Sequence, residues 1–459
     1  MPDVSATRAA RPMSLPAATP ESMGIPSGAL SALVERLERL ESDPHALAVA
    51  RHGRVVARGA WAPYRLEDAT LVYSLSKTFL AAAVAFAVEE GLMDLDAPIA
   101  QYFPEVEAPG RSAQMRVRDL LSMATGHEED LVEPIFGPDP VAGLLAREPE
   151  HEPGTVFTYN QSGPFLLSAA ITRLTGQRVG EYLRPRLFEP LGIGPRWWTQ
   201  AGEADLGFTG LHARVGDILA LGQTLLDGGS FGGARVLPEG WVDLASSVHI
   251  PTSPRPSPPD WQQGYGFLMW RSRHGFRADG ACGQLCLVLP DEGLVVALTS
   301  ATDDLQAELD AVWETLLPAL APASLAEDAP AQAALAQELA RAEIPLAPAS
   351  SNTPFAHGTM RPDGAGWTVD VDGLSFGVGS DDWRRTLVPV GSSVLPIAAQ
   401  GRATGDGGWE ATAVVTSSPH RMLLRALPGS SVVEVRWHVP PLRSDDLRLL
   451  AAPEWAAGE

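Results

Sequence analysis

Lysine is almost absent from this chain. Of its 34 basic residues only one, Lys77, is a lysine, and all the others are arginines. Arginine stays protonated in proteins, whereas a lysine that is removed from water can lose its proton near neutral pH and act as a base. Because arginine supplies the rest of the positive charge, Lys77 is a candidate for chemistry.

Clustered cysteine and long apolar runs are missing as well. The two cysteines, Cys282 and Cys286, lie four apart in a strand-like stretch, where extended backbone separates their Cα atoms by roughly 13 Å, too far for a disulfide. The histidines are scattered, so no zinc site is indicated. The longest apolar run, Phe79–Val88, has about half the length of a bilayer span. We expect no disulfide between these cysteines, no metal, no other cofactor and no membrane-spanning helix.

Positive net charge is also lacking. The formal charge of −22 would on average repel nucleic acid and anionic membranes, so neither is an expected partner. The first twenty residues carry Arg8 and Arg11 but no apolar segment of the kind found in secretory signals. We therefore expect a cytoplasmic location. The sequence does not indicate an oligomeric state.

Hydrophobic spacing predicts a mixed α/β fold (α+β) up to about residue 320. A helix and a hairpin at His45–Ala50 and Val55–Trp61 come first, residues 112–247 are mostly helical, and strand patterns return between residues 266 and 300. Strands from both ends of a helical middle predict one antiparallel sheet flanked by helices, with a helical subdomain beside it and a cleft between them.

Composition changes beyond residue 320. Residues 321–351 are rich in alanine and proline and contain one short helical pattern at Ala331–Ala342, which is typical of a linker. Short glycine-punctuated strands then predict a small antiparallel β-barrel or sandwich over residues 352–459. The expected organisation is an arm over residues 1–20, a catalytic domain over residues 21–320, this linker and the β domain.

A serine precedes the single lysine by three residues. In Tyr73-Ser74-Leu75-Ser76-Lys77, Ser74 would begin the apolar helix and Lys77 would follow one turn later on the same face. Burial disfavours the charged amine, so Lys77 could accept the Ser74 proton. Ser-x-x-Lys alone is a weak motif, and its alternative meaning is a helix start with a solvent-facing lysine. An apolar helix is a costly place for an idle charge, which favours the catalytic interpretation.

Three segments in order resemble the class C β-lactamase-like family of penicillin-recognising serine enzymes. They are Tyr73–Phe79, Val117–His127 and Pro153–Asn160, and together they are far more specific than any one of them. The family includes D-alanyl-D-alanine peptidases, esterases, 6-aminohexanoate-dimer hydrolases and some acyltransferases. The resemblance covers about residues 20–320 and implies a β-lactamase/transpeptidase-like fold with Ser74 as nucleophile.

The resemblance also implies that Tyr159 relays protons between Ser74, Lys77 and the leaving group. A core tyrosine is the alternative for this position. The family usually has asparagine or serine two residues after this tyrosine, but this chain has Gln161 there and Asn160 one position earlier. Either amide is therefore a candidate substrate contact.

The family's third motif, Lys-Thr-Gly or His-x-Gly, has Ala278-Asp279-Gly280 as its best match. By the resemblance, Gly280 would let substrate approach the backbone, and the N–H groups of Ala281 and Ser74 would form the oxyanion hole. The motif's cation is missing, which favours uncharged esters or amides over penicillins. Asp279 could bind a cationic or hydroxyl group or be a turn aspartate. Tyr265 is a candidate pocket wall.

One other serine-hydrolase signal is weaker. Gly228–Gly232 satisfies the Gly-x-Ser-x-Gly string but follows a helical pattern rather than a strand, so we interpret it as a turn.

The expected function is hydrolysis of a small ester or amide through an acylated Ser74. Acyl transfer or macrocyclisation at the same residues is the alternative, since a C-terminal domain over the cleft would exclude water. A non-catalytic binding protein of the same fold is the alternative from another class.

Overall fold

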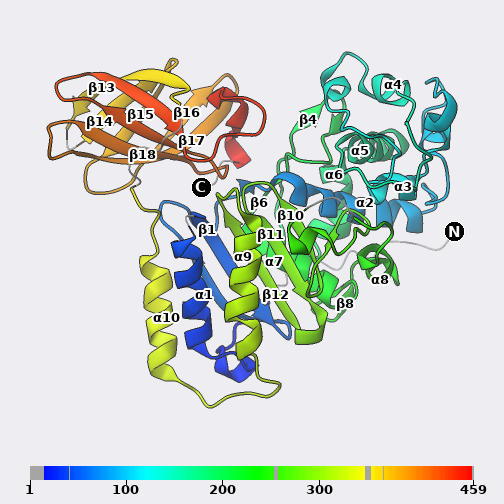
Figure 1. Cartoon of the computed structure of the whole chain (residues 1–459), viewed down its shortest axis with the longest axis horizontal. Helices are drawn as coiled ribbons and strands as arrows, with labels where there is room; N and C mark the ends of the chain where they lie inside the picture. Colours follow the sequence, from blue (N-terminus) through cyan, green and yellow to red (C-terminus); the bar gives the residue numbers. More distant parts are fainter. Residues whose placement is uncertain (1–14, 41, 253–256, 347–352, 365, 457–459) are drawn as a thin grey trace.

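The structure is a computed structural model that describes residues 15–40, 42–252, 257–346, 353–364 and 366–456. It contains a mixed α/β part with a helical lobe, and a separate β domain near the C-terminus (Figure 1). The predicted fold class is confirmed. Residues 1–14 of the expected N-terminal arm lie outside the described residues, while Val55 exchanges backbone hydrogen bonds with Pro16 and Ala18.

A six-stranded antiparallel sheet joins the two ends of the catalytic part. Strand β1 pairs with β12, which lies more than 240 residues later, with Leu47 opposite Leu298. The hairpin and the return of strands between residues 266 and 300 were predicted, but β10 was recognised only as a motif. The strand order is β2 (Arg54–Ala60), β1 (Pro44–Arg51), β12 (Leu294–Ser300), β11 (Gln284–Leu289), β10 (Phe276–Gly280) and β9 (Trp270–Arg271).

Both faces of this sheet are covered by helices. Alternate side chains of a strand point to opposite faces, so Leu47 packs against helices α1 (Ser27–Arg39) and α9 (Leu305–Thr315), and Ala48 faces the core on the side of α7 (Val215–Leu226). Figure 1 shows α1, α9 and the linker helix α10 (Ala329–Arg341) side by side. The linker helix packs against α1 and β2.

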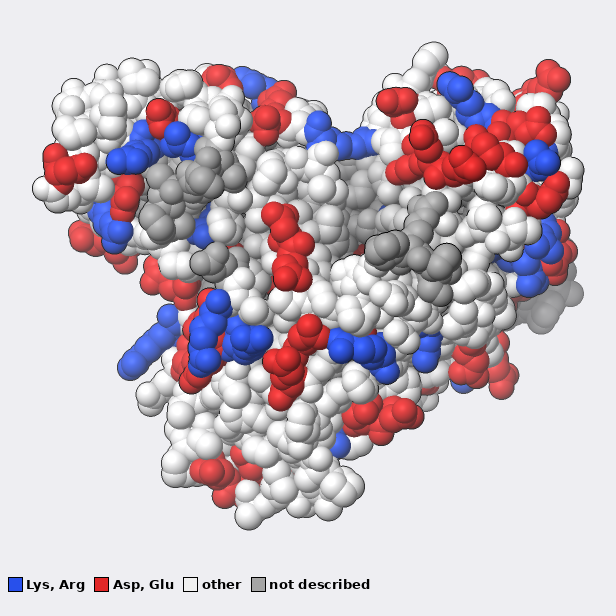
Figure 2. All heavy atoms as spheres, viewed as in Figure 1, with Lys and Arg blue, Asp and Glu red and all other residues white. Residues whose placement is uncertain are grey.

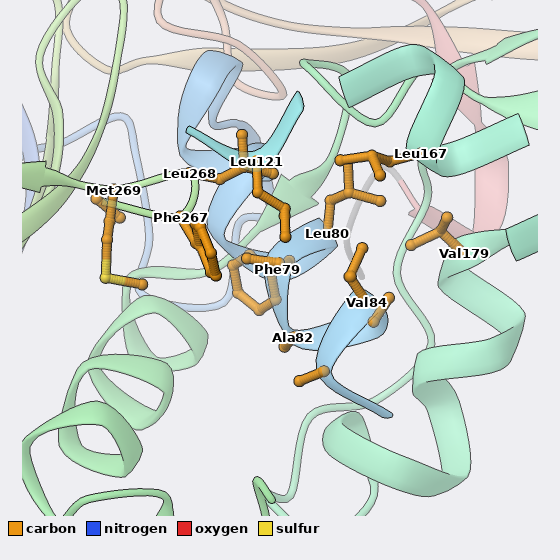
Figure 3. Close-up of a cluster of buried hydrophobic side chains, with 14 of the residues drawn as sticks. Phe79, Leu80, Ala82, Val84, Leu121, Leu167, Val179, Phe267, Leu268 and Met269 are labelled. Atoms are coloured by element: carbon orange, nitrogen blue, oxygen red, sulfur yellow. The ribbon is translucent and has the colours of Figure 1, made fainter. Parts of the chain in front are cut away.

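Helix α2 (Ser76–Glu89) lies between the sheet and the helical lobe. Its residues from Ser76 to Ala87 are all buried, as an all-apolar helix requires, and Figure 3 shows Phe79, Leu80 and Val84 among side chains of neighbouring elements. The apolar run at Phe79–Val88 thus lies within a buried helix. The lobe contains α3 (Val117–Leu121), α4 (Pro140–Leu145), α5 (Ser162–Thr175), α6 (Val179–Leu183) and α8 (Trp241–Ser246).

The C-terminal domain is an antiparallel barrel rather than a sandwich. Its sheet curls until β15 also meets β17, where Gly379 pairs with Gln400, and inward side chains such as Phe376 and Trp409 fill the interior. The strands are β13 (Ala356–Asp363), β14 (Gly366–Val371), β15 (Leu374–Gly379), β16 (Arg384–Val390), β17 (Ser393–Ala403), β18 (Trp409–Val415), β19 (Arg421–Ala426), β20 (Val432–Trp437) and β21 (Ala452–Pro453).

Polar and charged contacts join the barrel to the catalytic part. The buried Asp43 carboxylate lies 2.5 Å from Nε of Arg421 and 2.9 Å from Nε2 of His438. Burial raises the pKa of Asp43, but the hydrogen bond from His438 and the charge of Arg421 outweigh it and hold that pKa below its ordinary value. The Tyr64 hydroxyl donates to the Ser418 carbonyl at 2.8 Å. The two parts thus share buried polar partners.

Among the residues that the structure describes, no helix has the length and apolarity that crossing a membrane requires.

Candidate active site

Ser74 lies at the point where the chain enters α2. A short 3-10 turn, Tyr73–Leu75, leads directly into the helix, and Tyr73 adopts a left-handed backbone conformation with φ of 46°. A left-handed non-glycine residue is costly and is held only by its surroundings. Ser74 is half-buried, and Lys77 is 1% exposed one helical turn later. The turn therefore presents the serine hydroxyl beside a desolvated amine.

Three oxygen atoms surround the Lys77 amine. Nζ lies 2.9 Å from Ser74 Oγ, 2.7 Å from Gln161 Oε1 and 2.9 Å from the Phe208 carbonyl oxygen. Carbonyl oxygens only accept hydrogen bonds, so a neutral amine must give its two N–H groups to Gln161 and Phe208. Its lone pair then points at Ser74, where it can take the hydroxyl proton.

Burial sets the protonation of this lysine. Desolvation lowers the pKa of Lys77 to about 7, although the charges of Asp130 and Asp279 oppose the shift. A lysine with this pKa is about half deprotonated at neutral pH, so little free energy is needed to reach its basic form. The Lys77 amine thus lies within hydrogen-bond distance of the Ser74 hydroxyl, and burial brings its pKa near neutral.

This value predicts the pH dependence of acylation. Below about pH 7 Lys77 carries a proton and cannot serve as a base, so the acylation rate should fall about tenfold per pH unit. Above that pH the rate should reach a plateau. The measurement is the rate of inactivation by a fluorophosphonate between pH 5 and 9. A flat profile across pH 7 would contradict the base role.

Tyr159 covers the lysine and contacts the serine. Its ring lies 4.7 Å from Lys77 Nζ, and its hydroxyl is close enough to Ser74 for the serine to lower the pKa of the phenol against the effect of burial. Burial and the charge of Asp279 raise the pKa of Tyr159 well above its ordinary value, so it is a phenol at neutral pH. The ring stacks on Trp270 with centroids 5.6 Å apart. Tyr159 is placed to donate a proton rather than to act as a phenolate base.

Gln161, not Asn160, faces the catalytic cluster. Asn160 is fully buried, and its amide bonds to Thr158 and to the start of α5 at Ser162 and Gly163. The expected substrate contact of Asn160 is therefore wrong: the residue holds the turn before a helix. Gln161 uses its side-chain oxygen on Lys77.

Strand β10 brings the third motif against the nucleophile. A Cβ at Gly280 would lie 2.2 Å from the Val72 carbonyl oxygen and 3.1 Å from the amide nitrogen of Ser74, so only glycine allows this approach. The next residue, Ala281, is half-buried. The motif thus runs beside the Ser74 turn, as the expected oxyanion hole of Ser74 and Ala281 requires.

Two other expected contacts are corrected. Asp279 lies within β10 rather than in a turn, is 9% exposed, and accepts a 2.9 Å hydrogen bond from Nε of the fully buried Arg277. Its carboxylate is therefore paired and is not free to bind a cationic substrate. Tyr265 is 1% exposed and packs behind Tyr159, so it is a core residue rather than a pocket wall.

Sequence reasoning missed three contributors that come from distant segments. The Phe208 carbonyl binds Lys77, and the Asp130 carboxylate accepts the backbone N–H of Gln161 at 2.7 Å. Arg443 of the C-terminal domain lies over the rings of Phe136 and Phe208, at 3.9 and 5.9 Å. No spacing rule connects these positions to Ser74. A cation is therefore present near the site after all, on a loop of the barrel.

The remaining sequence signals do not join this cluster. Gly228 and Gly229 lie in the turn after α7, as predicted, while Ser230 lies in β7 (Ser230–Phe231), which forms a small hairpin with β8 (Ala234–Arg235). Both cysteines are free and buried. Among the described residues there is no group of histidine, cysteine and carboxylate side chains that could hold a metal ion.

An antiparallel sheet, a helical lobe and a serine-lysine pair at the start of the central helix define the β-lactamase/transpeptidase class of fold. A sequence profile of the Beta-lactamase family matches residues 34–321, more than half of the chain. The chain belongs to this family.

Characterised relatives are distant. The 6-aminohexanoate-dimer hydrolase of Paenarthrobacter ureafaciens is 27% identical over 233 residues, which are 46% of this chain and 58% of that protein. Lovastatin esterase of Penicillium rubens is 24% identical over 208 residues, 38% of this chain and 51% of the esterase. The chain thus spans about half the length of these curated relatives.

Solved structures share the fold. EstCE1, described as a hydrolase with promiscuous acyltransferase activity, matches with a TM-score of 0.51 and 17% identity, over 62% of this chain and 99% of its own. SurE matches with a TM-score of 0.51 and 20% identity, over 89% of this chain and 98% of its own. Coverage of 89% extends into the C-terminal barrel, so SurE shares the two-domain architecture.

Proposed function

We propose that this protein is a serine hydrolase that acts on a small ester or amide through an acyl-enzyme at Ser74. The observation that carries the proposal is the position of the Lys77 amine, which has two neutral carbonyl acceptors and the Ser74 hydroxyl as its third neighbour. A general base needs hydrogen-bond reach and a pKa near the working pH, and Lys77 has both. The names of the relatives, among them hydrolases and esterases, support the class of reaction.

In the first half-reaction, neutral Lys77 takes the proton of Ser74 while Oγ attacks the substrate carbonyl carbon. The oxyanion receives hydrogen bonds from the N–H groups of Ser74 and Ala281. The Tyr159 phenol gives its proton to the leaving alcohol or amine and regains one from the Lys77 ammonium. In the second half-reaction, water attacks the acyl-enzyme and gives its proton to Lys77, and the Lys77 ammonium passes that proton to the departing Ser74 oxygen, which restores both side chains.

The experiment compares wild type with Ser74→Ala by labelling with a fluorophosphonate probe. We expect covalent labelling of the wild type, located by mass spectrometry at Ser74, and none of the variant. Ser76→Ala is the matched control, because Ser76 is fully buried and accepts the Leu211 backbone N–H at 3.1 Å. Equal labelling of wild type and Ser74→Ala would contradict the proposal. No labelling of the wild type would favour a binding protein of this fold.

A second candidate is acyl transfer to an amine or alcohol, including macrocyclisation. It is favoured by the barrel loop near the site: Arg443 lies over Phe208, whose carbonyl binds Lys77, and both Leu442 and Phe136 are more than half exposed. Figure 2 shows the molecule hollowed between the barrel and the helical lobe. Exposed apolar side chains beside a cation suit a second substrate larger than water.

Product analysis separates the two candidates. An activated ester would be supplied with and without an added amine, and free acid and amide would be quantified by mass spectrometry. Amide formation that exceeds the uncatalysed background supports acyl transfer. Release of acid alone, at an unchanged rate, supports hydrolysis.

A further inference from the structure

The C-terminal barrel reaches the backbone turn that carries the nucleophile. Tyr73, the residue before Ser74, is 7% exposed, and its hydroxyl lies 2.6 Å from Nε2 of His420. His420 stands just before β19 of the barrel and is fully buried. One side chain therefore joins the Ser74 turn to the other domain.

The direction of this hydrogen bond follows from the neighbours of His420. Its Nδ1 lies 2.9 Å from the Val439 carbonyl oxygen, which only accepts, so Nδ1 carries the ring proton. Nε2 is then an acceptor, and the Tyr73 hydroxyl donates to it. Desolvation lowers the pKa of His420 to about 4, which keeps the ring neutral and preserves this arrangement at physiological pH.

Both backbone segments of the expected oxyanion hole meet the barrel at the same place. Tyr73 precedes the Ser74 amide and Cys282 follows the Ala281 amide, and both residues have left-handed backbones with φ of 46° and 60°. They form one small apolar cluster with Ala301 and with Val439 of the barrel. Left-handed backbone at these residues requires support from surrounding structure.

The two turns differ in how they are held. Within the catalytic part, Gln284 donates to the Cys282 carbonyl at 2.8 Å and Ser300 donates to the Gly283 carbonyl at 2.9 Å, so the turn at Ala281 has its own side-chain supports. The Tyr73 side chain instead has its hydrogen-bond partner, His420, in the barrel.

We infer that Tyr73 and His420 are positioning residues, through which the C-terminal barrel holds the Ser74 turn and sets the geometry of nucleophile and oxyanion hole. The inference rests on the proposed function, since it concerns acylation of Ser74. A misplaced oxyanion donor weakens transition-state stabilisation and leaves ground-state binding largely unchanged.

The chain offers a matched pair of variants. Tyr73→Phe and Tyr64→Phe each delete one hydroxyl that is buried between the domains and bonded to the same barrel turn, at His420 and at Ser418 respectively. Tyr64 does not adjoin the nucleophile. If these bonds only dock the barrel, both variants should behave alike. If Tyr73 positions Ser74, acylation should suffer in Tyr73→Phe alone.

The experiment measures inactivation by a fluorophosphonate as a function of its concentration, which gives a maximal rate and a half-saturating concentration for each variant. We expect Tyr73→Phe to lower the maximal rate about tenfold, the effect of one hydrogen bond felt in the transition state, with the half-saturating concentration unchanged. Tyr64→Phe should stay within about twofold of wild type. Thermal unfolding should show similar losses of stability in both.

His420→Phe tests the bond from the barrel side. It keeps a ring beside Trp437 but removes the acceptor, and combining it with Tyr73→Phe should cost no more acylation rate than either single change. Equal maximal rates in Tyr73→Phe and Tyr64→Phe, or a change confined to the half-saturating concentration, would overturn the inference while labelling of wild-type Ser74 upholds the proposed function. Absence of wild-type labelling would contradict the proposed function itself.

Discussion

Lys77→Arg should acylate about 10² to 10⁴ times more slowly than wild type, although the charge of the side chain is the same as that of protonated lysine. General bases contribute about 10² to 10⁴ in rate, and a guanidinium does not release its proton in a protein. The Lys77 amine already has three oxygen atoms within 2.9 Å, so the larger guanidinium would have to displace its neighbours. The measurement is the fluorophosphonate inactivation rate at pH 8, where wild-type Lys77 is mostly neutral.

Lys77→Met separates the two causes of the expected loss, which are the absence of a base and the larger size of the guanidinium. Methionine is apolar, close to lysine in size and flexible enough to fill the same space, yet it has no basic nitrogen. Slow acylation by both variants would indicate loss of the base. Wild-type rates in Lys77→Arg would refute the assignment of Lys77, whatever the methionine variant does.

Gly280→Ala should lower the acylation rate by about 10² to 10³, the range that follows loss of one oxyanion donor. The added methyl carbon would lie 2.2 Å from the Val72 carbonyl oxygen, so β10 must move away from the Ser74 turn and take the Ala281 amide with it. The fold should survive, because the clash is relieved at the end of a strand. Acylation rate and circular dichroism are the two measurements.

Gly216→Ala is the matched control for that prediction. Gly216 lies in α7, and a Cβ there meets no atom within 4 Å. Alanine in a helix is favoured over glycine by up to about 1 kcal/mol, so this variant should be as active as wild type and slightly more stable. If Gly280→Ala matched it in activity, the close approach of β10 would have no catalytic meaning.

Local sequence spacing predicted the Ser74–Lys77 pair. The other contacts of the site are made by residues that are distant in the sequence, and these were not predicted. Ser74 lies in the 3-10 turn that leads into α2 and Lys77 lies in the first turn of α2, so helical backbone over three residues is enough to bring them together. Asn160 and Gln161 are adjacent residues of one turn. Asn160 is bonded to the start of α5, and this leaves the Gln161 amide to face Lys77. Sequence patterns carry no such information about a turn.

Strand β10 shows why part of the sheet was hard to predict. Arg277 and Asp279 interrupt its apolar pattern, yet both are buried because they pair with each other. In the sequence, two charged residues that form a buried ion pair look the same as two charged residues of an exposed loop. The position of Arg443 could not be predicted for another reason. It belongs to a loop more than 350 residues after Ser74, and only the docking of the barrel brings it near Phe208.

The buried carboxylate of Asp43 constrains how this architecture can be recombined. Its partners, the Arg421 guanidinium and the His438 imidazole, are supplied by the barrel, so a barrel transplanted from a two-domain relative would have to bring equivalent partners or leave an uncompensated anion in a buried interface. Chimeras within the family should therefore tolerate exchange of surface loops far better than exchange of the whole C-terminal barrel.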